Sequence, residues 1–331
     1  MRSLYFLVPG TLPPFGGGGL WAELKFCQLV QQLAPAELVT YRQRESGYRF
    51  LPDVLKREPP GESIFVVSWG FDVPHLIRQL QDRPVVYHAH SASYGFSLPA
   101  DIPIVAVSRN TMGYWGQHSP NSPIHYLPNQ IGEEFYNRNQ PRDIDVLVQG
   151  RKSSEYLLQQ LVPALRSRCQ VKVLDGYVED LAGLFNRSRI YLYDSAEYWA
   201  TSGVTEGFGL PPMEALACGC QVFSSVNSAL ADYLDPGFNC HKIAAYSTTY
   251  DVQRILAVLA DEHAPALPAS YFDPYRAPAL TQRLQTILRE IETFFDCKPS
   301  LQPDIPSLTT WRKAQLKVKQ LIAKVQRKLK R

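Results

Sequence analysis

The sequence predicts an α/β protein built from two doubly wound, Rossmann-like domains that face each other across a cleft. Short apolar runs rich in Val, Ile and Tyr alternate with segments of helical period, and the alternation restarts after residue 140. The chain has 331 residues, of which 45% are hydrophobic, enough for two cores. We therefore expect an N-terminal domain at 1–140, a C-terminal domain at 141–297 and a tail at 298–331.

The first domain begins with an expected strand, LYFLV at 4–8, and an amphipathic helix at 20–33. Further apolar runs continue a buried parallel sheet at 64–68, 85–89 and 104–108. Residues 121–136 are expected to form the loop that leads into the second domain.

The second domain repeats this pattern. Its expected strands are 144–150, 170–174, 189–194 and 221–225, and its expected helices are 153–168, 211–219, 252–262 and 279–295. A linker with Pro299, Pro303 and Pro306 follows. The tail closes with a basic helix, one face of which carries Val318, Leu321, Ile322, Val325 and Leu329.

The net charge of +3 conceals an asymmetry. Residues 312–331 contain nine Lys or Arg and no Asp or Glu, which leaves 25 basic against 31 acidic residues in the body. A weakly acidic body argues against an extended surface for nucleic acid. The basic tail also lacks aromatic interleaving beyond Trp311, which argues against nucleic acid as its partner. The apolar stripe and the lysines of 309–331 favour an anionic membrane surface. A solvated tail, or a helix that docks on the body, is the alternative.

Cysteine spacing and hydropathy limit the location. The six cysteines form no disulfide framework and no zinc-binding pattern, which favours a reducing compartment. The apolar run at 4–8 is too short for a signal peptide, and no stretch of about 18 apolar residues could cross a bilayer. We expect a cytoplasmic protein, peripheral at the inner face of the membrane if the tail binds lipid.

The segment 205–219, TEGFGLPPMEALACG, is the most informative. Two prolines suit the first turn of a helix, which puts Glu214 in that turn and Glu206 on the loop before it. Gly207 and Gly209 let the loop backbone approach a ligand. The helix N-terminus favours a phosphate, whereas carboxylates suit vicinal hydroxyls. A nucleotide sugar offers both groups. An ordinary acidic helix start is the simpler alternative, but it does not require EGFGLP.

This segment resembles the E-x7-E signature of retaining glycosyltransferases of the GT-B fold, family 4 type. The resemblance implies that Glu206 contacts hydroxyls of the donor sugar and Glu214 the ribose. It implies that the backbone of Gly207, Phe208, Gly209 and Leu210 lies beside the diphosphate. It also implies retention of anomeric configuration and no obligate metal or other cofactor.

Basic residues at 150–152, GRK, follow the first strand of the second half, where the family carries a basic pair for the diphosphate. Arg151 takes the first position and offers bidentate geometry. Tyr156 occupies about the place of the family's usual lysine, so Lys152 is the substitute.

The glycines at 15–19, FGGGG, resemble the family's acceptor-side loop, which brings Gly18 and Gly19 to the donor. GGGLWA at 17–22 also fits a dinucleotide fingerprint. Eight residues separate it from the preceding strand, too many for that tight turn, so we do not expect a dehydrogenase.

The strand VVYHA leads into His90, which matches the family's histidine near the donor sugar, with His88 as the fallback. Both share one face because strand residues alternate. Ser108 and Asn129 match landmarks that we expect to be structural. Asp232 is a counterpart of an acid that the family often carries near this position.

We therefore expect a glycosyltransferase that moves a sugar, with retention, from a nucleotide-diphosphate donor to an acceptor hydroxyl on a lipid or glycan. Glu206, His90 and Arg151 are the expected catalytic residues. A non-catalytic nucleotide-sugar-binding scaffold is the alternative, and a phosphorylase or synthase of the same fold is a third.

Overall fold

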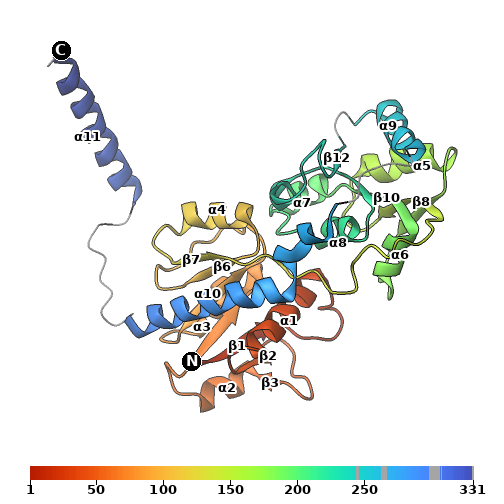
Figure 1. The fold of residues 1–331 in the computed structure, drawn as a ribbon. Coiled ribbons are helices and arrows are strands. Elements are labelled where there is room, and N and C mark those ends of the chain that lie inside the picture. Colours follow the sequence, from red (N-terminus) through yellow and green to blue (C-terminus); the bar gives the residue numbers. More distant parts are fainter. Residues whose placement is uncertain (244–245, 262–266, 298–305, 307, 330–331) are drawn as a thin grey trace. The chain divides into compact units, whose positions relative to one another are not determined.

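The computed structural model describes residues 1–243, 246–261, 267–297, 306 and 308–329. The chain divides into one compact unit, residues 1–291, and a second unit, residues 292–331. The larger unit contains two parallel sheets, each covered by helices (Figure 1). Pro299 and Pro303 of the expected linker lie outside the described residues.

The first sheet has seven parallel strands in the order β3-β2-β1-β4-β5-β6-β7. The strands are β1 (Ser3–Val8), β2 (Ala36–Thr40), β3 (Arg49–Phe50), β4 (Ser63–Val67), β5 (Val85–Ala89), β6 (Ile104–Ala106) and β7 (Ile124–Tyr126). The helices are α1 (Gly18–Gln31), α2 (Leu51–Arg57), α3 (Val73–Gln79) and α4 (Arg109–His118). The central strands β1 and β4 are almost wholly apolar and buried, as a sheet covered on both faces requires.

Strand β7 corrects the sequence prediction, which placed 121–136 in a loop. Residues Ile124–Tyr126 pair in parallel with β6, and Leu127 donates its backbone N–H to the carbonyl of Ala106. The strand is three residues long, lies at the sheet edge and is flanked by Pro123 and Pro128. Such a short edge strand has no apolar run or alternation that a sequence pattern could detect.

The second sheet has five parallel strands in the order β12-β11-β10-β8-β9. The strands are β8 (Ile144–Gln149), β9 (Val171–Leu174), β10 (Ser188–Tyr193), β11 (Gln221–Ser224) and β12 (His241–Lys242). The helices are α5 (Val162–Arg166), α6 (Leu181–Arg187), α7 (Ala196–Ser202), α8 (Leu210–Ala217) and α9 (Thr248–Ala260).

The helix expected over 153–168 is not a regular α-helix. Residues Leu157–Leu161 form a wider turn with i to i+5 hydrogen bonds, and α5 follows from Val162. Pro163, two residues after Leu161, lacks the backbone N–H that a regular helix needs. The wide turn therefore accommodates the proline while Leu157, Leu161 and Leu165 stay buried.

Helix α10 (Ala277–Cys297) connects the end of the second half with the first sheet. Leu280, Leu284 and Leu288 are buried, and the Glu290 carboxylate lies 3.3 Å from the His125 ring in β7. Helix α10 therefore contacts the first half, although it follows the second in sequence (Figure 1). The domain boundary near residue 140 stays a prediction.

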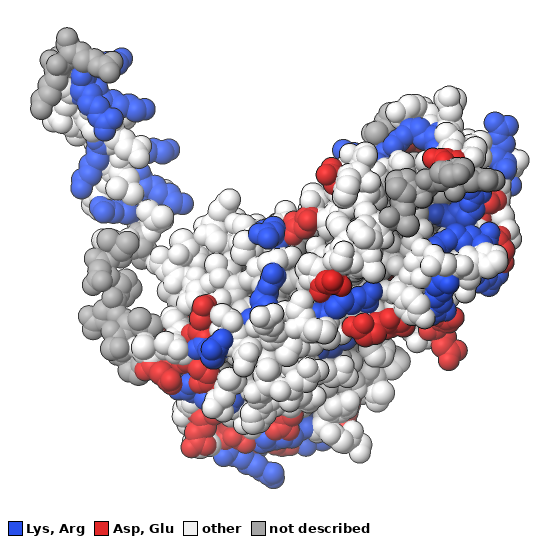
Figure 2. Space-filling model, in the orientation of Figure 1, with Lys and Arg blue, Asp and Glu red and all other residues white. Residues whose placement is uncertain are grey.

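The second unit contains the expected basic helix, α11 (Thr310–Leu329). Lys and Arg side chains follow this helix along its length (Figure 2). In the part of the chain that is described, no helix has the length and the apolar character needed to cross a bilayer.

Candidate functional site

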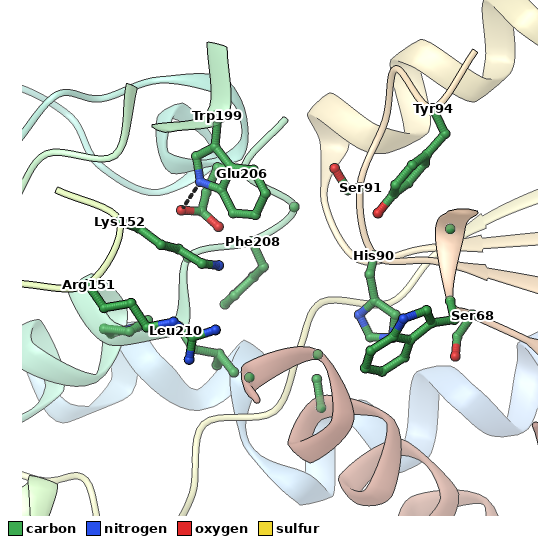
Figure 3. Close-up of a pocket in the computed structure, with 18 of the residues that line it drawn as sticks. Ser68, His90, Ser91, Tyr94, Arg151, Lys152, Trp199, Glu206, Phe208 and Leu210 are labelled. Atoms are coloured by element: carbon green, nitrogen blue, oxygen red, sulfur yellow. Dashed lines mark hydrogen bonds between the residues drawn. The ribbon is translucent and has the colours of Figure 1, made fainter. Parts of the chain in front are cut away.

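A cavity of about 390 Å³ lies between the two sheets (Figure 3). One wall comes from segments after β4 and β5 and from the start of α1, and the other from segments after β8 and β10 and from the loop before α8. Parallel strands place their carboxyl ends at one edge, where ligands of doubly wound folds bind. Every predicted site residue except Glu214 lines this cavity.

Glu206 is the most strongly bonded residue of the site. Its side chain is buried, and its Oε2 atom accepts hydrogen bonds from Tyr193 (2.5 Å), Ser195 (3.2 Å) and the indole N–H of Trp199 (2.7 Å). Strand β10 supplies Tyr193, helix α7 supplies Trp199, and Ser195 is the residue that directly precedes α7. Because Oε2 is occupied, the carboxyl group offers Oε1 to a ligand in the cavity.

Lys152 lies beside Glu206 on the same wall (Figure 3). Its backbone is in the left-handed region, with φ of +67°, and its ammonium group lies 4.2 Å from the centroid of the Trp199 ring. Burial lowers the pKa of Lys152. The negative charge of Glu206 acts to raise this pKa, and the positive charge of Arg151 lowers it further. Two adjacent cations at one wall provide an anion site.

The structure gives a different reason for Gly207 and Gly209 from the one that the sequence suggests. Neighbouring protein atoms, and not a ligand, occupy the space where a side chain would lie. A Cβ atom on Gly207 would lie 1.4 Å from the carbonyl oxygen of His90. Gly209 has φ of +78°, and its Cβ would lie 2.3 Å from Leu230. The loop before α8 thus contacts the loop after β5 directly, and Thr205 and Ser91 exchange hydrogen bonds beside it.

Helix α8 begins at Leu210, so Glu214 lies in the second turn and not, as expected, in the first. Pro211 and Pro212 remove two of the N–H groups that a helix N-terminus normally offers to an anion. Glu214 is buried, and within the described ranges no hydrogen bond reaches its carboxyl group. Burial raises its pKa to about 7, the charge of Lys25 opposes this shift, and Glu134 adds to it.

His90 forms part of the opposite wall (Figure 3). His88 lies two positions earlier, in β5. Both rings contact Glu23 of α1, at 2.7 Å from His88 Nδ1 and 2.8 Å from His90 Nε2. Among the described residues, these three form the group whose ligand atoms, all within 4.8 Å of one another, could hold a metal ion.

The remaining family landmarks have structural contacts. Ser108 caps helix α4 by accepting the backbone N–H of Thr111 at 3.0 Å. Asp232 accepts the backbone N–H of Arg109 and so joins the two halves. Asn129 lies near His88 in a small cavity outside the main site.

Besides the predicted Phe208, the cavity is lined by five aromatic residues that sequence reasoning missed, which are Trp69, Phe71, Tyr94, Tyr193 and Trp199. Three of these follow or end a strand that the sequence did predict, at 64–68 or 189–194. The rule that ligands bind at the carboxyl ends of parallel strands would have drawn attention to them.

Known proteins resemble this chain in sequence and in fold. Residues 134–269 match the family described as "Glycosyl transferases group 1". The Escherichia coli protein "Serotype-specific mannosyltransferase WbdA" is 30% identical over 122 residues, which are 35% of this chain. The match covers 12% of that much longer protein.

Solved structures show the fold over most of the chain. A glycosyltransferase from Rickettsia africae superposes with a TM-score of 0.64 and 11% identity, covering 88% of this chain and 98% of that chain. Anabaena HepE, solved with UDP and glucose, superposes with a TM-score of 0.63 and 14% identity, covering 87% of this chain and 100% of that chain. The protein has the GT-B fold that the sequence predicts.

Proposed function

We propose that this protein is a glycosyltransferase that transfers a sugar from a nucleotide-diphosphate donor to an acceptor hydroxyl. The observation that carries the proposal is the composition of one cavity. Arg151, Lys152 and Glu206 line one wall, and His90 and the glycines of α1 line the other. A negatively charged diphosphate needs the cations, and a neutral sugar needs the carboxyl and imidazole groups.

The donor diphosphate would lie against Arg151, Lys152 and the backbone N–H groups of Gly209 and Leu210. Charge develops on this leaving group as the bond to the sugar breaks. Cations that are already in place stabilise this charge without reorganisation, which is the usual source of electrostatic catalysis. Glu206 Oε1 would accept a hydroxyl of the sugar, and His90 would approach it from the other wall. No step in this scheme requires a metal ion.

Glu214 would accept the ribose hydroxyls, as the resemblance implies. Its carboxyl group is buried one helical turn beyond Leu210, without a hydrogen-bond partner in the described part of the chain. A nucleotide bound over the start of α8 would supply the missing donors. In that case, binding would favour the ionised carboxylate and release a proton near neutral pH.

A thermal-shift screen tests the donor site directly. Ligand at a hundredfold excess over its dissociation constant adds about 2.7 kcal/mol to the free energy of unfolding. We expect one of UDP, GDP or ADP, or its sugar, to raise the melting temperature, and Glu214→Ala to lose most of this shift. No shift with any of these would contradict the proposal.

Turnover distinguishes a transferase from a non-catalytic scaffold of the same fold. A scaffold would show the thermal shift without donor hydrolysis or transfer. Intact Glu206 and its three donors favour the enzyme. For a hexosyl donor, the anomeric configuration of the product, read by proton NMR, tests retention, since an inverted product would contradict the family 4 assignment.

The first-half wall favours a glycan as acceptor. Phe71 is 70% exposed at the cavity, and its ring packs edge-on against Tyr94 at 5.0 Å between centroids. Gly70 makes this arrangement possible, because a Cβ there would lie 2.1 Å from the Tyr94 ring. Exposed, rigid aromatic rings offer the apolar faces of sugar rings a contact surface at little entropic cost.

The tail would bring the enzyme to an anionic membrane surface that carries a lipid-linked acceptor. Val318, Leu321, Ile322 and Val325 form one apolar face of α11, and each is more than half exposed. Residues 310–329 contain seven Lys or Arg and no acidic residue. Such a helix lies in the membrane interface with its cations among anionic headgroups. The side chain of Leu329 lies outside the described residues.

Vesicle cosedimentation of the full chain tests this part of the proposal. Leu321→Glu places a charge on the apolar face, whereas Gln320→Glu adds the same charge to the polar face. We expect binding to phosphatidylglycerol-containing vesicles to fall about tenfold or more for Leu321→Glu only. Equal losses in both variants, or equal binding to neutral phosphatidylcholine vesicles, would contradict it.

A further inference from the structure

A buried polar cluster outside the donor-binding wall is formed by Glu23, His88 and His90. Glu23 lies on α1, and the histidines occupy alternate positions in and just after β5. The side chains of Glu23 and His88 are 1% and 2% exposed, whereas that of His90 is 16% exposed at the cavity. The cluster thus connects the buried interior of the first half with the proposed donor pocket.

One carboxylate oxygen holds both rings. Glu23 Oε2 lies 2.7 Å from His88 Nδ1 and 2.8 Å from His90 Nε2. Burial alone would raise the pKa of Glu23, but the hydrogen bonds of the histidines, and the positive charges that these rings carry at low pH, outweigh it and lower the pKa to about 2. The carboxylate is therefore ionised at neutral pH and can only accept hydrogen bonds, so each ring must donate an N–H to it.

This requirement determines which nitrogen of each ring carries the proton. His88, whose pKa burial lowers and Glu23 partly restores, is neutral at pH 7 and donates from Nδ1. His90 donates from Nε2 to the same oxygen, so a ring that carries a single proton has its lone pair on Nδ1. The Phe26 ring, 4.2 Å from the His88 ring between centroids, packs against the cluster and restricts its movement.

We propose that Glu23 is a positioning residue that holds His90 as the Nε2–H tautomer, with Nδ1 presented to a sugar hydroxyl in the cavity. The identity of the ligand as a sugar rests on the proposed function. The tautomer of His90 follows from the contacts of Glu23 and does not depend on that function. His88 anchors the second lone pair of the same oxygen and so keeps the carboxylate oriented. Without Glu23, the His90 ring could rotate or exchange tautomers, and the acceptor would be lost part of the time.

The distances favour hydrogen bonds over a metal ion. Ligand atoms bound to one zinc ion at about 2.0–2.1 Å lie about 3.3 Å apart in a tetrahedral site. The nitrogen–oxygen distances in this cluster are 2.7 and 2.8 Å, which is normal for a charge-assisted hydrogen bond. The same nitrogens would have to lose their protons to bind the metal.

Nitrogen-15 NMR of the full chain, labelled at histidine, reads the tautomers without any substrate. We expect His90 to be protonated at Nε2 and His88 at Nδ1, and zinc ions to leave both signals unchanged. A His90 ring protonated only at Nδ1, or stoichiometric zinc binding that displaces the ring protons, would overturn the inference. Because no sugar is present, this result stands apart from success or failure of the proposed function.

Two substitutions then connect the tautomer with activity. Glu23→Ala removes the acceptor, and we expect a mixture of His90 tautomers and roughly tenfold weaker turnover. Glu23→Gln keeps an acceptor oxygen, so it should restore the Nε2–H form and return activity to within about threefold. Gln28→Ala, on the exposed face of the same helix, is the control for helix stability.

Activity that falls while the His90 tautomer stays unchanged would mean that Glu23 acts only through packing, and the inference would fail. Equal losses in Glu23→Ala and Glu23→Gln would also overturn it. If Glu23→Ala does not fold, the wild-type and Glu23→Gln spectra still decide the question.

Discussion

Glu206 and Glu214 stand eight positions apart in one short segment, but their surroundings are opposite. The Glu206 carboxyl group is held by three protein donors and opens to the cavity. The Glu214 carboxyl group is buried without a hydrogen bond among the described residues, and burial raises its pKa to about 7. The first residue is preorganised, whereas the second has a desolvation cost that a bound ligand could relieve.

The difference shows how one motif can separate two tasks. A group that must stabilise a transition state benefits from a fixed orientation before the substrate arrives. A group that recognises a ligand can remain unsatisfied, because the ligand then gains the whole benefit of pairing with it. Substitutions between and around the two glutamates test this separation.

Gly207→Ala should have the largest effect. Its Cβ would lie 1.4 Å from the His90 carbonyl oxygen, so the loops of the two halves would have to move apart. A displacement of about 1 Å at a catalytic site can cost roughly a hundredfold in rate. We expect at least that loss in donor turnover. Gly176→Ala, where the added Cβ meets nothing within 4 Å, is the control. A normal rate in folded Gly207→Ala would show that the closed arrangement is not needed.

Glu206→Gln should come next. Its amide can keep its oxygen toward Tyr193, Ser195 and Trp199, and it then presents an NH2 group to the cavity in place of an acceptor. Loss of one charged hydrogen bond, about 1.5–3 kcal/mol, predicts a ten- to hundredfold fall in turnover with an unchanged melting temperature. Steady-state kinetics check this, and an active variant would remove Glu206 from the catalytic group.

The sequence allowed the fold and ten of the residues that line the cavity to be predicted, because both depend on strong signals. Buried parallel strands are continuous apolar runs, and the segment around Glu206 combines residue types that few other sites need. Strand β7 could not be predicted, since its three residues, with a proline close by on each side, are too few to show a period. The hydrogen-bond donors of Glu206 were also missed, and so was Glu23 as the partner of the predicted His88 and His90, because these groups come together only through tertiary packing.

The glycines also show that a sequence pattern does not identify tertiary contacts. The sequence suggests that Gly207 and Gly209 make room for a ligand, but the structure shows that they make room for His90 and Leu230. A pattern identifies a position that excludes a side chain. Only the structure shows which atoms would occupy that space.

Glu214→Gln should change how stability depends on pH. The folded-state pKa of about 7 exceeds the ordinary value of 4.5, so this group favours folding at low pH and loses that contribution as the pH rises from about 4.5 to 7. The Gln side chain of Glu214→Gln does not ionise, so the stability of this variant does not change for this reason as the pH rises. Urea unfolding should therefore show Glu214→Gln gaining about 2–3 kcal/mol relative to wild type between pH 5 and pH 8. Parallel stability curves would mean that Glu214 is ionised in the free protein.

Trp199→Phe should have the smallest effect and isolates one donor of the Glu206 cage. The change removes the indole N–H that lies 2.7 Å from Glu206 Oε2 but keeps an aromatic ring near the Lys152 ammonium group. Tyr193 and Ser195 still hold the carboxyl group, so we expect turnover to fall about three- to tenfold. Tyr198→Phe, which removes a hydroxyl from the neighbouring ring without touching Glu206, is the matched control. If turnover fell as far in Trp199→Phe as in Glu206→Gln, catalysis would depend on the hydrogen bonds that hold Glu206 and not on its cavity-facing oxygen. The difference between Glu206 and Glu214 would then lie in these donors.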